Sequence, residues 1–192
     1  GYAFDQLYLR KEGNWAKSSQ AWDEQRAAAR DTQHSLLHNG GFESGADGWT
    51  AYFPQCCTIT EAGAYAGKAC GKVTNAESTL GGCWEALLPV TPGESYLVGA
   101  QAKTAGIQGP GYAYLAVYQY AADGKILHFV DFTQFRQTTD WQRCETHVDV
   151  VPNAVRVVLH AGLYQAAGTI WIDEATCGPL PHEDRINAHY GQ

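Results

Sequence analysis

From Leu37 onward, apolar residues recur at every second position in short runs, and Gly, Pro and Asp-Gly turns separate these runs. Within 111–120, Leu115 and Val117 fall on one side of the alternation and tyrosines fall on the other. A period of two is that of a β-strand, whose successive side chains point to opposite faces of a sheet. Many short strands with turn signals between them predict an all-β fold, in which two antiparallel sheets pack as a β-sandwich.

The segment 19–38 has a different character and predicts one N-terminal helix. Ser18 or Ser19 can cap its start, and a run of alanines favours helix. Its apolar stripe is thin, so we expect it to pack on the side of the sandwich or on a neighbouring chain. The chain is thus expected to comprise an N-terminal extension, 1–37, a sandwich, 38–178, and a C-terminal tail or linker, 179–192.

Charge and motif content exclude several classes of function. The chain carries 20 acidic side chains against 13 Lys and Arg, a net charge of -7, and it has no basic run to bind nucleic acid. No apolar stretch approaches the roughly 20 residues of a membrane-spanning helix. No catalytic motif occurs either, and four acids qualify as glycosidase carboxylates by residue type alone. We therefore expect no enzyme activity from these acids: Asp131, Asp140, Glu145 and Asp149.

The six cysteines bear on the compartment in which the chain works. None forms a C-x-x-C pair, so a zinc site is not expected. An even number spread through strand-like sequence favours disulfides and an oxidising environment, which predicts a secreted or cell-surface protein. Six cysteines allow 15 pairings, among which the sequence does not choose. The alternative is six buried thiols in a cytosolic protein.

Two phrases far apart in the chain carry a family resemblance. The first is Asn39-Gly40-Gly41-Phe42-Glu43, followed by Gly48-Trp49, and the second is Gly168-Thr169-Ile170-Trp171-Ile172-Asp173. They resemble the first and last strands of calcium-binding jelly-roll carbohydrate-binding modules, which are appended to secreted xylanases, glucanases and related enzymes. The resemblance covers about residues 38–178. It implies a jelly-roll sandwich that binds a polysaccharide or oligosaccharide without catalysis.

The resemblance also implies a structural calcium ion that ties the first strand to the last. Carried over by position, Glu43 and Asp173 would supply carboxylate oxygens, and the backbone carbonyls of Gly41 and Lys68 would supply more. This donor set suits calcium, which takes six to eight hard oxygen ligands. The alternative is that both acids are ordinary surface residues at strand ends.

A candidate ligand face follows from the alternation around the tyrosines. Leu115 and Val117 define a buried side, which leaves the tyrosines of 111–120 on the outer side. The same alternation turns polar side chains of neighbouring strands outward, beside rings that suit the apolar face of a sugar. The alternative is packing alone, and the N-terminal helix is a candidate to cover this face. The predicted ligand residues are Tyr112, Tyr114, Tyr118, Gln101, Arg156 and His160.

Two further expectations concern tryptophans and assembly. Trp49, Trp141 and Trp171 occupy strand positions that are more often in the core.

A helix ahead of such a module is also similar to the arrangement in phage tail fibres and pilus-associated surface proteins, where the helix docks into a filament. The alternative function is therefore a displayed domain of an extracellular assembly, with 1–38 as the contact to a neighbouring domain or subunit.

Overall fold

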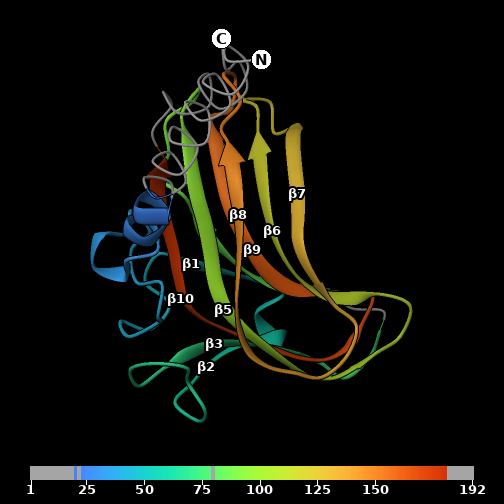
Figure 1. Ribbon diagram of the computed structural model, residues 1–192. Coiled ribbons are helices and arrows are strands. Elements are labelled where there is room, and N and C mark those ends of the chain that lie inside the picture. The colour runs from blue at the N-terminus through green and yellow to red at the C-terminus, as the bar shows by residue number, and fades with distance from the viewer. Residues whose placement is uncertain (1–19, 21–22, 79–80, 181–192) are drawn as a thin grey trace, which may run out of the picture.

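In a computed structural model of the chain, the residues that can be described are 20, 23–78 and 81–180. They form two five-stranded sheets in which every paired strand is antiparallel (Figure 1). The predicted all-β sandwich is therefore confirmed. Short 3-10 helices lie at η1 Thr32–His34 and η2 Pro54–Cys56.

We call the first sheet the tyrosine sheet, because its strand β6 Tyr112–Tyr120 carries a row of tyrosines. In spatial order it contains β1 Trp49–Tyr52, β4 Gly82–Leu87, β9 Arg156–Tyr164, β6 Tyr112–Tyr120 and β7 Ile126–Phe135.

The second sheet carries two tryptophans on its outer face, and we call it the tryptophan sheet. In spatial order it contains β2 Cys57–Thr60, β3 Cys70–Asn75, β10 Ala167–Leu180, β5 Ser95–Gln108 and β8 Thr139–Asp149.

The core lies between the two sheets and follows the predicted alternation. Leu115 of β6, Leu159 of β9 and Ile172 of β10 are each at most 1% exposed. Val155 departs from the alternation that Val157 and Leu159 continue, because it is 67% exposed just before β9 begins. Because successive side chains of a strand point to opposite faces, the residues between these core positions point outward from each sheet.

The N-terminal helix is shorter than predicted. Its described part comprises residue 20 and residues 23–29, whereas the prediction extended it to 38. Asp31 has extended backbone angles, and its side chain accepts a hydrogen bond from the Gln33 amide, which starts η1 in place of another helical turn. The correction moves the helix end to Ala29.

The helix packs on the tryptophan sheet and leaves the tyrosine sheet uncovered by the described helical residues. Ala29 is buried with Leu97 and Leu180, and its backbone passes so close to Gly178 that a Cβ there would meet it. Arg30 donates two hydrogen bonds to the Glu145 carboxylate, at 2.8 and 2.5 Å. Among the described residues, no helix has the length and apolar character required to cross a membrane.

The first of the two phrases is a compact turn rather than the predicted first strand. Asn39 and Phe42 have positive φ angles of 54° and 59°, which interrupt any strand. The Asn39 amide donates to the carbonyls of Gly45 and Asp47, both at 2.9 Å, and so closes the turn on itself. The turn nevertheless lies beside the last strand, because Ala175 donates its amide to the Gly40 carbonyl.

The cysteines also depart from the prediction. All six carry free thiols and all six are buried, so the predicted disulfides are not formed. Burial raises the pKa of Cys57 and of Cys177 to about 12, and both thiols are therefore neutral at physiological pH. They pack as small apolar side chains, which matches the alternative of six buried thiols.

Candidate functional site

The outer face of the tyrosine sheet presents a row of half-buried aromatic rings along β6. Tyr118 lies at its centre, stacked on Phe129 of β7 at 5.4 Å between ring centroids and 11° between planes. Tyr120 also stacks on Tyr118, at 6.2 Å between ring centroids, and the His160 ring of β9 approaches Tyr118 to 4.7 Å. Burial raises the pKa of Tyr118 to about 12, so its hydroxyl stays protonated. We call this outer surface the tyrosine face.

The same row continues toward the start of β6. Tyr112 packs against Tyr114 at 6.2 Å and against Tyr164 of β9 at 5.6 Å, and the Arg136 guanidinium lies 5.1 Å from the Tyr112 centroid. The Tyr112 hydroxyl donates to Asp131 at 2.9 Å. Burial raises the pKa of the Tyr114 hydroxyl far above its ordinary value, so this hydroxyl also stays protonated.

A buried carboxylate organises the charged part of the tyrosine face. Glu85 of β4 is 6% exposed, and it pairs with the guanidinium of Arg156 and, at 2.7 Å, with Nε2 of His160. Burial alone would raise the pKa of Glu85, but the His160 hydrogen bond and the charges of His160 and Arg156 outweigh it and lower the pKa. Arg156 also lies 5.0 Å from the Tyr120 centroid, so one network joins charges and rings.

Cys83 lies two residues before Glu85 on β4, on the same face of the strand. Its Sγ is 3.9 Å from Nδ1 of His160, and burial raises the pKa of the thiol to about 11. A thiol with so high a pKa is neutral and a poor nucleophile at physiological pH.

The structure brings together five of the six predicted ligand residues. Tyr112, Tyr114, Tyr118, Arg156 and His160 all point outward from adjacent strands β6 and β9.

Gln101 does not join them. It lies on β5 of the tryptophan sheet, between Asp173 and Arg143, on the opposite side of the sandwich. Sequence reasoning also missed Glu85 and Phe129. The alternation of Trp84 and Ala86, both buried, would have turned Glu85 outward, but Trp84 alone is ambiguous in the sequence.

The tryptophan sheet presents an outer row of its own. Trp171 stands between Lys72 and Lys103 of the flanking strands, and Lys103 lies 4.8 Å from the Trp141 centroid and 4.9 Å from that of Trp171. Both tryptophans are half-buried on the surface, which corrects their expected core positions; Trp49, in contrast, is 6% exposed and in the core. The Lys103 ammonium also donates to the Gly63 carbonyl at 2.8 Å, and this hydrogen bond holds Lys103 beside both rings.

The residues predicted to hold calcium gather where the first turn meets β10. Asp173 is fully buried and accepts amide hydrogen bonds from Tyr65 and Ala66, at 2.8 and 3.1 Å. Glu43 accepts from the amides of Lys68 and Ala69, at 2.8 and 3.1 Å. Burial raises the pKa of Asp173 to about 6 despite its amide donors.

Gly41 sits at the centre of these acids. A Cβ at this position would lie 3.2 Å from Oε1 of Glu174 and 3.4 Å from Oδ1 of Asp173. We call the set of Gly41, Glu43, Asp173 and Glu174 the acidic cradle. Within the described ranges, no three His, Cys, Asp or Glu side chains are arranged to hold a metal by themselves. A cation here would need backbone carbonyls in addition.

A family model described as a carbohydrate binding domain matches residues 34–166. Among solved structures, the C-terminal family 22 carbohydrate-binding module of Clostridium thermocellum Xyn10B is similar, with a TM-score of 0.62 and 16% identity over 78% of this chain and 96% of that module. The family 22 xylan-binding domain of Paenibacillus barcinonensis Xyn10C has a TM-score of 0.54 and 17% identity over 76% of this chain and 91% of its own.

A third similar structure is the enzymatically active domain of tailspike protein 4 from bacteriophage CBA120. Its TM-score is 0.61 at 12% identity, and the match covers 78% of this chain but 22% of the tailspike chain. At these identities the likenesses show the fold alone. No curated protein sequence matches this chain.

Proposed function

This chain belongs to the carbohydrate-binding domain family, and on that premise we propose that it binds a polysaccharide on the tyrosine face without cleaving it. The observation that carries the proposal is the aromatic row of β6 lying directly beside the Glu85 network. Sugars need both elements, since their C–H faces pack on rings while their hydroxyls need donors and acceptors.

The polar groups of the tyrosine face suit a neutral glycan. Tyr118 and Tyr112 keep their hydroxyl protons, because burial raises the pKa of both. Arg156 is 39% exposed at its side chain, so its guanidinium has donors to offer beyond those that Glu85 takes. Glu85 fixes the orientation of Arg156 and His160 before any ligand arrives, which lowers the entropy lost on binding.

The electrostatics of the same face support binding without catalysis. A glycosidase needs a carboxylic acid whose pKa is raised so that it can protonate the leaving group. Glu85 has a lowered pKa because its two basic neighbours hold it in the charged form. The other carboxylate of the face, Asp131, accepts from the Tyr112 hydroxyl and from the Gln134 amide.

We further propose that the acidic cradle holds one structural calcium ion. The carboxylates of Glu43 and Asp173, with the carbonyls of Gly41 and Lys68, would be its ligands, and this hard-oxygen set fits calcium. The close approach of Glu174 and Asp173 to Gly41 supports the assignment, since a cation would relieve the repulsion between these acids. Bound there, the ion would tie the first turn to β10.

A secreted or cell-surface location is part of the same proposal, because cell-wall polysaccharides such as xylan lie outside the cell. The free cysteines lend it no support, since it rests on the family alone. A contact of 1–38 with a neighbouring domain or subunit also stays a proposal. The helix occupies part of the tryptophan sheet, so such a contact would leave the tyrosine face open.

Calorimetry against oligosaccharides of xylan, glucan, mannan and galactan tests the binding proposal. Xylan is the first probe, since it is the ligand named for the Paenibacillus domain. Tyr118→Ala should weaken binding by about 1–3 kcal/mol, the cost of losing one stacked ring. The control is Tyr65→Ala, which removes a 50% exposed tyrosine that packs on Trp141 instead. Equal affinity of Tyr118→Ala and wild type, or no binding to any of the four glycans, would overturn the proposal.

A further inference from the structure

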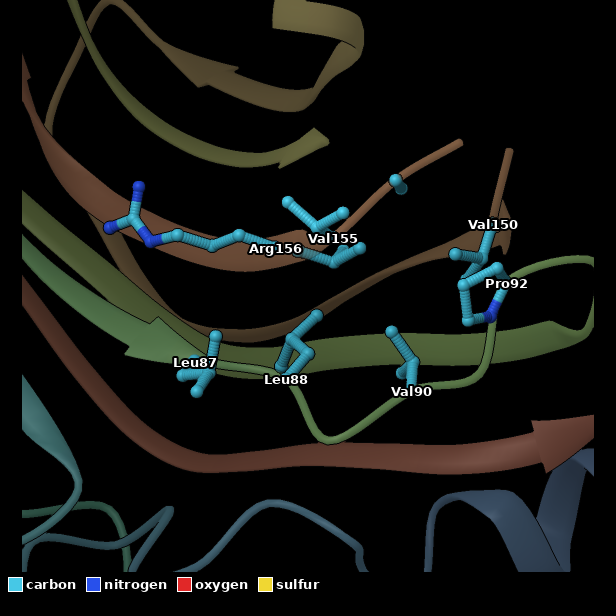
Figure 2. Close-up of a pocket in the computed structure, with 9 residues that line it drawn as sticks. Leu87, Leu88, Val90, Pro92, Val150, Val155 and Arg156 are labelled. Carbon is cyan, nitrogen blue, oxygen red and sulfur yellow. The ribbon is translucent and has the colours of Figure 1, made fainter. Parts of the chain in front are cut away.

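A pocket of about 270 Å³ opens at one end of the tyrosine sheet, where β4 and β9 separate. The two strands are paired as far as Leu87 and Val158, and the Leu88 amide donates one more bond to the Val157 carbonyl. Beyond this point the chain segments 88–92 and 150–155 separate and meet again where Val150 lies beside Pro92, and the pocket lies between them (Figure 2). Its floor is continuous with the core, because the lining residues Leu88, Val150 and Val157 belong to the buried core cluster.

The side chains that line the pocket are apolar apart from Arg156, although polar atoms also contribute to its surface. Leu87, Leu88 and Val90 form one wall, and Val150 and Val155 form the other (Figure 2). Leu87 and Val155 are 60% and 67% exposed, although a leucine and a valine in such positions gain from burial. A hollow with exposed apolar side chains at its rim is typical of a binding site.

Arg156 connects this pocket to the tyrosine face. Its aliphatic stem lines the pocket, and its guanidinium points away from Leu88 and Val155 (Figure 2). The guanidinium pairs with Glu85 and lies 5.0 Å from the Tyr120 ring centroid. The Val155 amide donates to the Tyr120 carbonyl at 2.9 Å, so the pocket begins where the aromatic row ends.

We propose that the pocket is a subsite for an acyl ester substituent on the polysaccharide held by the tyrosine face. This inference rests on the function proposed above. The side chains of Leu87 and Val155 offer a sugar hydroxyl no hydrogen-bond partner, so an unsubstituted sugar gains little by packing against them. An acyl group has an apolar chain for the Leu87 and Val155 walls and an ester carbonyl that Arg156 can donate to at the rim. The ligand class is therefore an O-acylated polysaccharide.

Calorimetry with one xylan oligosaccharide in three forms tests the subsite: unsubstituted, O-acetylated and O-butyrylated. Burying one methyl group should strengthen binding about fourfold, and each added methylene should contribute a similar factor. The butyryl form should therefore bind tightest. Leu87→Ser and Val155→Ser, made separately, should reduce this gain while leaving affinity for the unsubstituted form unchanged. Both positions are mostly exposed, so we expect both variants to fold.

Ile126→Ser is the matched control, because Ile126 is a 52% exposed apolar residue of β7 that does not line the pocket. It should retain the full dependence on acyl length. Binding of the unsubstituted form with no gain from either acyl group would overturn the subsite and leave the proposed function intact. No binding of any form would overturn both.

A second copy of the chain is the rival occupant of this apolar surface. Sedimentation velocity distinguishes it, since the subsite predicts a monomer whose size Leu87→Ser does not change. A wild-type dimer that Leu87→Ser and Val155→Ser dissociate would assign the pocket to self-association and overturn the inference.

Discussion

Replacing Glu85 by Gln should reveal how strongly the charged network holds the tyrosine face together. The substitution keeps the shape of the side chain but removes the negative charge that Arg156 and His160 share. Their side chains are 39% and 13% exposed, so the uncompensated charge is partly desolvated. Losing one partner of a fully buried pair costs about 3–5 kcal/mol, and the exposure of Arg156 reduces this to about 2–3 kcal/mol.

The direction of the Glu85 pKa shift determines how this stabilisation changes with pH. The pKa of Glu85 in the folded protein lies below its ordinary value of 4.5, so the folded state favours the charged form. The stabilisation is therefore fully present above pH 4.5 and is lost as pH falls through the lower, folded pKa. The difference in unfolding free energy between wild type and Glu85→Gln should shrink in that acid range.

Urea unfolding at neutral and acid pH measures both effects. Glu94→Gln is the matched control, since Glu94 is an exposed acid in the turn before β5. At neutral pH, Glu85→Gln should lower the unfolding free energy by about 2–3 kcal/mol and Glu94→Gln by less than about 0.5 kcal/mol. Equal effects of the two variants, or a Glu85 effect that grows toward low pH, would refute the reasoning.

Three further predictions follow from the cradle, a glycine and the thiols. Chelating calcium should lower the melting temperature of wild type, because a ligand that binds only the folded state stabilises it, and Asp173→Ala should remove that sensitivity; a melting temperature indifferent to chelator would contradict the calcium proposal. Gly67→Ala should destabilise the fold by at least about 1 kcal/mol in urea unfolding, because Gly67 has a φ of +62° and a Cβ there would collide with the Glu43 carboxylate; an unchanged midpoint would refute this. Thiol labelling should count six reactive cysteines in the unfolded, unreduced protein, since all six are free; fewer than six would show that disulfides form after all.

The alternation of apolar residues predicts which side of each strand faces the core, and this part of the fold follows from the sequence. It succeeds for Leu115 and Leu159, whose neighbours then point outward. It fails for Gln101, because alternation gives the inner and outer side of one strand but not the sheet to which that strand belongs. Sheet membership depends on long-range pairing, which a local pattern does not contain.

Other differences have local physical causes that single-sequence patterns do not resolve. The turn at Asn39 depends on three side-chain hydrogen bonds and on a positive φ that few residues adopt. Trp171 reads as a core residue because tryptophan is usually buried, yet it lies between two lysines on the outer face. Glu85 cannot be predicted as a site residue until the pairing of β4 with β9 is known, because that pairing brings it beside Arg156 and His160.

Mapping the chemical-shift changes that an oligosaccharide causes in the protein tests the central claim most directly. Titrating a xylan oligosaccharide into the isotope-labelled chain reports which backbone amides sense the ligand. If the tyrosine face is the binding surface, the shifted amides should cluster on β6 and β9, around Tyr118, Arg156 and His160. Shifts confined to the tryptophan sheet, around Trp171 and Lys103, would contradict the account and place the glycan on the opposite side of the sandwich.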